Sequence, residues 1–282
     1  MQVMVALLAL AITTMTSSRG AAAYLYDDIQ VTWGSGCSFF YMDGGDADTL
    51  ALCLDRSSGS GFGSNASYIK LVAGNSAGTV ATFYLMPDDV PWEHHDEIDL
   101  EFLGNATGEP YTLHTNVFVN GAGGREQQFH LWFNPTQDFH TYSVEWNPKY
   151  IIFLVDDTPI RAYRNDGARG VPFPTWQRLR VAGSLWDAED WATQGGRVKT
   201  DWDQAPFYAY YRSLRVTPCA PSPGVAWCGD EPPESGWFDR RLDAAALQRV
   251  RAENMVYDYC ADHKRFDDTG FPVDTSFIHT LC

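Results

Sequence analysis

The sequence predicts an antiparallel all-β sandwich followed by a short C-terminal helix, and three observations support this fold class. Between residues 24 and 216, short apolar stretches are separated by turns rich in Gly, Asn, Asp and Pro. No helical period persists through this part, whereas apolar residues return at helical spacing between residues 241 and 260. Because 45% of the 282 residues are hydrophobic, the chain can bury a sizeable core.

Residues 1–23 have the pattern of a secretory signal peptide. An apolar run at residues 4–12 leads through a polar stretch to Ala21-Ala22-Ala23, a small-residue cleavage site. The run is too short to span a bilayer, and no later stretch reaches the roughly 18 apolar residues of a membrane helix. A buried N-terminal helix is the alternative interpretation. We therefore expect a secreted protein without a membrane anchor.

The β-sandwich is expected to occupy residues 24–216. Its clearest strands are predicted at 79–85, 111–119, 127–133, 141–146 and 151–155. The sequence Asp156-Asp157-Thr158-Pro159 is typical of a hairpin turn after the last of them. A Pro-, Ser- and Cys-rich bridge at residues 217–235 then opens a C-terminal extension, residues 217–282, which carries the helix expected at 241–260.

Six cysteines follow residue 23, and an oxidising destination makes disulfides their expected state. Six cysteines allow 15 connectivities, so spacing alone cannot select one. The local candidates are one pair in the Pro-rich bridge, one pair that would staple the C-terminus and one pair near the N-terminus. These pairs are Cys219 with Cys228, Cys260 with Cys282, and Cys37 with Cys53.

The charge balance and the missing motifs argue against several classes of partner and enzyme. Thirty-six Asp and Glu against 20 Lys and Arg give a formal charge of −16, which disfavours nucleic acids and anionic membrane surfaces. The chain has no GxSxG, P-loop or dinucleotide motif, so serine hydrolases and nucleotide enzymes are not expected. A metal site is only weakly indicated, because no CxxC pair is present and His94 and His95 lack a third partner.

The most informative stretch runs from residue 95 to residue 103. On a strand, residues two apart share one face, so Glu97, Asp99 and Glu101 would lie together. The intervening residues Ile98, Leu100 and Phe102 would then enter the core. A helix would not separate the acids from the apolar residues in this way. The pattern therefore predicts a strand that presents a row of three carboxylates.

Adjacent carboxylates have pKa values that are forced apart, which acid–base chemistry needs. Retaining glycoside hydrolysis uses two carboxyl groups roughly 5–5.5 Å apart. The Cα atoms of Glu97 and Glu101 would lie roughly 13 Å apart on a flat strand, so their side chains must lean together over a curved sheet. Glu97 would be the nucleophile, Glu101 the acid and base, and Asp99 would orient Glu97. The alternatives are a solvated polar face and a calcium site.

Ten tryptophans are more than a core of this size normally uses. Four of them, Trp176, Trp186, Trp191 and Trp202, fall within one segment rich in Gly and Asp. Aromatic faces that pack on sugar CH groups, with acids and amides at the rim, form a carbohydrate groove. The alternative is that these rings belong to the core. Two sequons, at Asn65 and Asn105, could carry glycans.

At these positions the sequence resembles a known family. The stretch 95–105, HDEIDLEFLGN, is similar to the active-site signature of plant xyloglucan endotransglucosylase/hydrolases in family 16 of the glycoside hydrolases. The resemblance extends to residues 73–79, 132–135 and 184–193, and to Tyr259-Cys260 and Lys264-Arg265-Phe266 near the C-terminus. It covers nearly all of residues 24–272.

The resemblance implies a concanavalin-like jelly roll with a long open cleft and retaining catalysis by Glu97 and Glu101. It implies a xyloglucan polymer as donor, a xyloglucan oligosaccharide or polymer as acceptor, no metal or organic cofactor, and a place in the cell wall or apoplast. We also expect a monomer. It marks Asn105 as a glycosylated position, and Cys219–Cys228 and Cys260 with a later cysteine as disulfides. Glycan contacts are implied at His114, Thr115, Asn116, Arg125, Glu126, Asp190, Trp191, Gly195 and Arg265.

The chain departs from the family pattern in three places. Between Ser67 and Lys70 it is shorter by most of one strand, and a missing strand would expose its neighbours' edges. The end after residue 272 is atypical, and Cys37 and Cys53 lie outside the family pattern.

The sequence as a whole leaves three possible functions. They are a xyloglucan transglucosylase, a hydrolase of xyloglucan or mixed-linkage glucan, and a non-catalytic wall protein that binds glucan.

Overall fold

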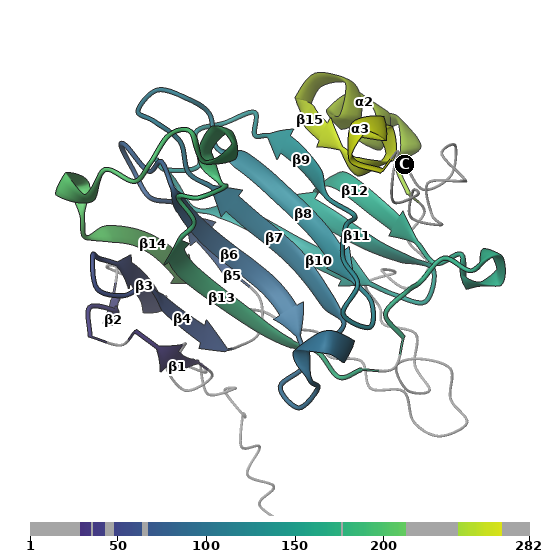
Figure 1. The fold of residues 1–282 in the computed structure, drawn as a ribbon, viewed down its shortest axis with the longest axis horizontal. Coiled ribbons are helices and arrows are strands. Elements are labelled where there is room, and N and C mark those ends of the chain that lie inside the picture. Colours follow the sequence, from purple (N-terminus) through teal and green to yellow (C-terminus); the bar gives the residue numbers. More distant parts are fainter. Residues whose placement is uncertain are drawn as a thin grey trace, which may run out of the picture.

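The computed structural model describes residues 29–34, 36–42, 48–63, 67–175, 177–212 and 242–266. The predicted signal peptide at 1–23 and the bridge at 217–235 lie outside these residues. Two antiparallel β-sheets stack face to face, with the C-terminal helices beside one edge (Figure 1). This arrangement confirms the predicted all-β sandwich with a short C-terminal helix.

The first sheet has eight strands, and neighbours in the sheet are often distant in the chain. Its order is β1 (Gln30–Trp33), β4 (Ser60–Gly63), β13 (Arg180–Asp187), β6 (Thr79–Met86), β7 (Glu97–Leu103), β8 (Thr112–Phe118), β9 (Gln127–His130) and β15 (Met255–Asp258). Strand β7, which carries the three acids, lies in the interior of this sheet between β6 and β8.

The second sheet has seven strands and covers the opposite side of the core. Its order is β12 (Thr158–Arg164), β11 (Tyr150–Val155), β10 (His140–Trp146), β5 (Ser67–Lys70), β14 (Phe207–Arg212), β3 (Asp48–Leu54) and β2 (Phe39–Met42). The short helices are η1 (Trp92–His94), η2 (Gly167–Arg169), η3 (Thr193–Gly196), η4 (Trp202–Gln204), η6 (Tyr259–Ala261), α2 (Ala244–Asn254) and α3 (His263–Phe266).

The core forms between the two sheets from side chains that alternate along each strand. In β14, Phe207, Ala209 and Tyr211 are buried, while Tyr208 and Tyr210 between them are partly exposed. Phe102 of the first sheet meets Tyr142 of the second, with ring centroids 4.6 Å apart and the planes at 72°. Edge-to-face contacts of this kind stabilise aromatic pairs beyond the area that they bury.

The hairpin predicted at residues 156–159 is confirmed. Val155 pairs with Thr158, so Asp156 and Asp157 form a two-residue loop between β11 and β12. Both residues have positive φ angles, 45° and 61°. Two successive left-handed residues are the mark of a type I′ turn, which matches the twist of the flanking strands, and Asp tolerates this conformation better than most residues.

The shortened segment at Ser67–Lys70 still forms a strand. β5 pairs with His140–Tyr142 of β10 on one side and with Tyr210–Arg212 of β14 on the other. The seven-stranded sheet is therefore continuous at these residues. The structure also shows the Cys37–Cys53 disulfide, one of the pairs that the sequence left open, with a Cα–Cα distance of 5.6 Å.

The C-terminal segment differs from its prediction. Helix α2 begins after Asp243, whose side chain accepts a hydrogen bond from the Ala246 backbone, but it ends at Asn254 and not near residue 260. Residues Met255–Asp258 form β15, which pairs with β9. Val256 and Tyr257 favour an extended chain, and an open strand edge was available, so tertiary pairing overrode the helical spacing.

Candidate active site

The face of β7 that the sequence assigns to the core is buried as predicted. Ile98, Leu100 and Phe102 are fully buried against the second sheet. Alternation along the strand therefore sends the neighbouring acids to the opposite face of the eight-stranded sheet. Glu97, Asp99 and Glu101 all line a cleft on that face. The predicted row of three carboxylates is confirmed as an arrangement, and its chemistry depends on what surrounds each acid.

The cleft crosses β13, β6, β7 and β8 and has a volume of about 290 Å³. Its walls carry aromatic, amide and hydroxyl groups around the acids, which suits a sugar chain with apolar CH faces and polar rims. Besides the three acids, it is lined by Thr82, Tyr84, Met86, Trp92, Asn116, Phe118, Ser184 and Trp186. Burial, and then the charges of Glu97 and Asp99, raise the pKa of Tyr84 to about 12, so its phenol remains a neutral hydrogen-bonding group.

Asp99 lies between the two glutamates and is buried. Burial raises the pKa of Asp99 well above its ordinary value, and the charges of Glu97 and Glu101 raise it further. Arg161 acts in the other direction. A hydrogen bond between Asp99 and Glu97 also favours the protonated form of Asp99. In that form Asp99 is a neutral donor that holds the Glu97 carboxylate.

Glu101 has the properties of a general acid. Burial, followed by the charges of Glu97 and Glu126, raises its pKa to about 7. It therefore keeps its proton at acidic pH and can also release it, which a group that alternates between acid and base requires. The different environments of Glu97 and Glu101 are the kind of division that two-carboxylate catalysis uses.

His114 lies beside Glu101, with Nε2 3.6 Å from Glu101 Oε2. Burial, with help from the charges of Arg161 and Arg265, lowers the pKa of His114 to about 4, so its ring is neutral. Gln128 Nε2 donates a hydrogen bond to His114 Nδ1 at 2.9 Å. Nδ1 is then the acceptor, and Nε2–H points toward Glu101. Gln128 thus sets the orientation and tautomer of this histidine.

Glu97 has a close partner on its other side. His95 Nε2 lies 2.6 Å from Glu97 Oε2, and both side chains are almost completely shielded from solvent. The chain is extended at His95, so residues 95 and 97 point to the same face. The His95 ring is stacked between Trp92 and Phe118, with centroid distances of 4.2 and 5.5 Å.

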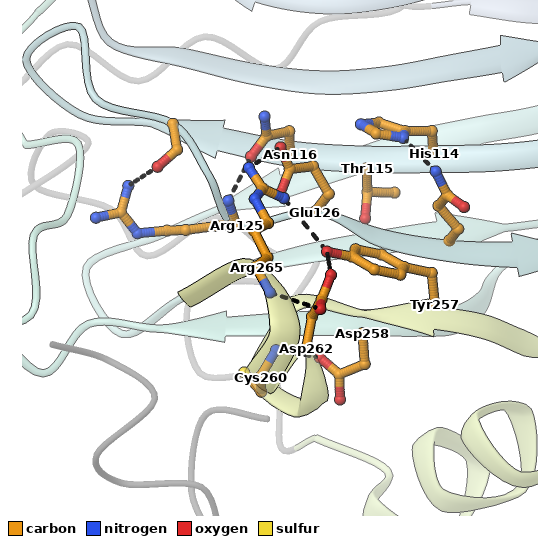
Figure 2. A network of polar contacts seen from close by, with 12 residues as sticks. His114, Thr115, Asn116, Arg125, Glu126, Tyr257, Asp258, Cys260, Asp262 and Arg265 are labelled. Carbon is orange, nitrogen blue, oxygen red and sulfur yellow. Dashed lines mark hydrogen bonds and ion pairs between the residues drawn. The ribbon is translucent and has the colours of Figure 1, made fainter. Parts of the chain in front are cut away.

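A polar network joins the C-terminal segment to the edge of the sheet beside the cleft (Figure 2). Arg265 donates two hydrogen bonds to the Glu126 carboxylate, at 2.5 and 3.0 Å, and a third to the Tyr257 hydroxyl at 3.3 Å. That hydroxyl in turn donates to Asp262 at 2.8 Å. Burial acts to raise the pKa of Glu126, but the hydrogen bonds from Arg265 bring it below its ordinary value. Glu126 is therefore held as a carboxylate.

Three of the predicted glycan contacts have mainly structural partners. The Thr115 side chain is completely buried and receives a hydrogen bond from Arg161 Nη1 at 2.8 Å. Arg125 is buried, and its Nη1 donates to the Ala122 carbonyl at 2.7 Å. Asn116 lines the cleft, yet its Oδ1 already accepts the Arg125 amide at 3.0 Å. Thr115 and Arg125 therefore support the cleft wall from behind, and Asn116 is part of the wall itself.

The other predicted glycan contacts differ in their exposure to solvent. Trp191 is 39% exposed and lies near His114 and Trp186, with both ring centroids 6.1 Å away. Asp190 is exposed and pairs with Lys199 at 3.0 Å. Gly195 has φ of 67° and open space where a side chain would start.

Of the four tryptophans that suggested a groove, only Trp186 is among the residues that line the described cleft. Trp191 lies beside it. Trp202 is partly buried and packs against the core and Phe207, with ring centroids 6.2 Å apart, which favours the alternative that this ring belongs to the core. Trp176 lies outside the described residues.

Two further groups of predictions concern modification and cross-linking. Asn105, in its sequon, is partly exposed, and its Nδ2 donates to the Pro110 carbonyl at 3.0 Å. Cys260 is disulfide-bonded. Cys219, Cys228 and Cys282 lie outside the described residues.

The sequence indicated a metal site only weakly. In the described part of the chain, one group of three side chains brings potential metal-ligating atoms together: Cys37, Cys53 and Asp55. Its two sulfurs, however, form the disulfide.

Two family descriptions match the chain. Residues 25–204 match the glycosyl hydrolases family 16, and residues 232–274 match the xyloglucan endo-transglycosylase (XET) C-terminus. The chain belongs to glycosyl hydrolase family 16. Among its curated relatives, a xyloglucan endotransglucosylase protein 7 from Diospyros kaki is 51% identical over 86% of this chain and 94% of that protein. A xyloglucan endotransglucosylase/hydrolase protein 24 from Arabidopsis thaliana is 49% identical over 87% and 88%.

Solved structures of glycan-active enzymes share the fold of this family 16 chain. A prokaryotic β-1,3-1,4-glucanase (lichenase) from a mouse hindgut metagenome has a TM-score of 0.50 and 23% identity, over 67% of this chain and 92% of that one. The Crh5 transglycosylase in complex with NAG has a TM-score of 0.51 and 20% identity, over 69% and 81%. At this identity the similarity concerns the fold alone, and it agrees with the predicted jelly-roll sandwich.

Trp92 was not singled out from the sequence, and the roles of His95 and Gln128 at this family 16 site were not predicted from it. Trp92 is 64% exposed at the cleft and stacks on His95, and Gln128 orients His114. The i, i+2 spacing of His95 and Glu97 was the available signal for their contact. The pairing of Gln128 with His114 needed the β8–β9 register, which single-sequence patterns do not provide.

Proposed function

We propose that the protein is a retaining xyloglucan endotransglucosylase that remodels the plant cell wall. The observation that carries the proposal is strand β7, where Glu97, Asp99 and Glu101 enter one cleft in different electrostatic environments. The xyloglucan substrate is supported by the names of the curated relatives and by the XET C-terminus.

The first half of the reaction cleaves the donor chain. A Glu97 oxygen attacks the anomeric carbon, the bond from that carbon to the glycosidic oxygen breaks, and Glu101 gives its proton to the departing oxygen. The donor fragment is then an ester of Glu97, and Glu101 is a carboxylate. Asp99 donates to Glu97 throughout and fixes the orientation of the nucleophile.

The second half transfers the fragment to a new chain. Glu101 takes the proton from an acceptor hydroxyl, whose oxygen attacks the anomeric carbon and displaces Glu97. The acceptor is a xyloglucan oligosaccharide or polymer. When water takes this place the outcome is hydrolysis, and the same two carboxylates serve both reactions.

Transfer requires an extended binding surface that competes with water. Strand β15 lengthens the eight-stranded sheet beyond β9, and the Arg265–Glu126 pair fastens it there. The loop after β8 is also tightly held: Asn120 donates to Asp96 at 2.9 Å, and Gly121 donates to the His95 carbonyl at 2.7 Å. Because this rim is already ordered, we expect it to favour binding of a long acceptor chain over entry of water.

The deciding experiment follows two signals in one reaction. Mature glycosylated protein is incubated with high-molecular-weight xyloglucan and a labelled xyloglucan oligosaccharide, and both label incorporation and new reducing ends are measured. Label entering the polymer with few new reducing ends supports the transglucosylase. New reducing ends without label in the polymer would make the protein a hydrolase. In that case the assay is repeated with mixed-linkage glucan to identify the substrate. Folded protein with neither signal would favour the non-catalytic glucan-binding alternative.

Matched variants tie the activity to the proposed residues. Glu97→Ala is expected to abolish turnover while leaving glucan binding measurable, and Glu109→Gln, which changes an exposed loop carboxylate, is the control. Turnover retained in Glu97→Ala would refute the assignment of the nucleophile.

The cellular setting belongs to the same proposal. The signal pattern at residues 1–23, the sequon at Asn105 and the Cys37–Cys53 disulfide support a secreted glycoprotein of the wall or apoplast. We propose that it acts as a monomer. No helix in the described part of the chain is long and apolar enough to cross a membrane. Mass spectrometry of the secreted protein tests both the cleavage after residue 23 and the glycan at Asn105.

A further inference from the structure

His95 is the closest polar neighbour of Glu97 that the reaction described above does not use. Its ring is 1% exposed, its Nε2 lies 2.6 Å from Glu97 Oε2, and its Nδ1 contacts the Trp92 carbonyl oxygen. Trp92 and Phe118 each stack on the ring. The ring is therefore held by two aromatic neighbours and by a contact at each nitrogen.

The partners of His95 determine where its protons lie. A carbonyl oxygen only accepts hydrogen bonds, so Nδ1 must carry a hydrogen to bond to Trp92. The contact between Nε2 and Glu97 Oε2 then contains one proton, either on the imidazole or on the carboxylate. The pair is thus an imidazolium with a carboxylate, or a neutral imidazole with a carboxylic acid.

Asp99 makes a second contact to the same carboxyl group, through its side-chain hydrogen bond with Glu97. Glu97 is therefore held by Asp99 as well as by His95, and the two contacts fix the orientation of its carboxyl group.

We propose that His95 is a positioning residue for the nucleophile: clamped by Trp92, its ring hydrogen-bonds through Nε2 to Glu97 and holds that carboxyl group aimed at the substrate. This inference rests on the proposed function, because it assumes that Glu97 attacks the sugar. No proton leaves His95 in the covalent step. The sugar–Glu97 bond forms, the glycosidic bond breaks, and the departing oxygen takes its proton from Glu101.

The test compares two substitutions of His95. His95→Phe keeps a flat ring between Trp92 and Phe118 but removes the donor, and His95→Gln keeps an amide donor near the position of Nε2. Turnover is measured with a xyloglucan oligosaccharide that carries a 2-chloro-4-nitrophenyl leaving group, which needs little protonation by Glu101. His94→Gln is the matched control, because the His94 side chain is exposed and bonds to Asn120.

In His95→Phe we expect kcat to fall about 10- to 100-fold, the size of a lost charge-assisted hydrogen bond, with little change in KM. His95→Gln recovers part of the loss, and His94→Gln keeps the activity. The defect of His95→Phe persists with the activated leaving group, whereas Glu101→Gln loses much of its defect there. If His95→Phe does not fold, His95→Leu, which also removes the donor, takes its place beside His95→Gln, and a kcat of His95→Leu within about twofold of the wild type overturns the proposal.

Three other results also overturn the inference. They are a kcat for His95→Phe within about twofold of the wild type, an effect confined to KM, and a defect that disappears with the activated donor. Failure of the proposed function is distinguishable, because it shows as activity in Glu97→Ala or as an inactive wild type. Neither of those depends on His95.

Discussion

Replacing Glu101 by Gln should stabilise the fold at neutral pH while it removes the general acid. An amide has nearly the shape of the carboxyl group but does not ionise, so it avoids the cost of a buried negative charge. In the folded protein that cost arises from burial first and from the charges of Glu97 and Glu126 second. A side chain retained for its chemistry is thus expected to weaken the structure that holds it.

The size and the pH range follow from the pKa of Glu101. The group ionises at an ordinary value of 4.5 when exposed and at about 7 in the fold, so the folded chain binds the proton more tightly between these values. The free energy of unfolding therefore falls as the pH rises through this window. The full difference corresponds to about 3 kcal/mol above pH 7, an upper figure because 22% of the side chain still contacts solvent.

Urea unfolding of the wild type and Glu101→Gln at pH 4.5 and pH 8 measures this difference. We expect nearly equal stability at pH 4.5 and a variant more stable by about 2–3 kcal/mol at pH 8. Glu109→Gln is the control and should show no such dependence, since Glu109 is exposed. Equal stability of the wild type and Glu101→Gln at both pH values would refute the claim that Glu101 is ionised at a cost.

Three more predictions address the rate, the C-terminal segment and the core. The kcat/KM of the wild type should fall as pH rises through about 7, because Glu101 loses the proton that it must donate; a flat pH–rate profile would contradict the two-carboxylate assignment. Arg265→Met should speed hydrogen–deuterium exchange in Met255–Asp258, with little change in β6, because it removes the two bonds to Glu126; unchanged exchange would contradict that role. Phe102→Ala should lower stability by about 3–5 kcal/mol in urea unfolding, since it leaves a cavity beside Tyr142.

The centre of the fold could be predicted because its signals are local. In β7 the acids and apolar residues alternate, so a single strand reveals both the buried face and the cleft face. The Asp156–Asp157 turn is equally local, because its two left-handed residues follow from turn chemistry. Where one segment's own sequence decides the outcome, the prediction and the structure agree.

The features that escaped prediction depend on segments that are distant in the chain. β15 forms because β9 has a free edge, although residues 255–258 continue a helical spacing. Trp202 packs on Phe207 of strand β14, and the Gly and Asp content of the segment around Trp202 gave no sign of that contact. Thr115 and Arg161 meet across the two sheets, 46 residues apart. Such contacts need a register and a sheet order, which hydrophobic patterns in one sequence do not fix.

The same alternation that makes β7 predictable also ties catalysis to stability. Ile98, Leu100 and Phe102 anchor the strand in the core, so the acids between them cannot move apart to relieve their repulsion. Each acid is instead given a different neighbour: His95 for Glu97, Glu97 itself for Asp99, and the neutral His114 for Glu101. A rigid strand with unequal neighbours divides three like groups into a nucleophile, a donor and an acid. Loosening the core beneath them should therefore weaken that division before it disrupts the fold.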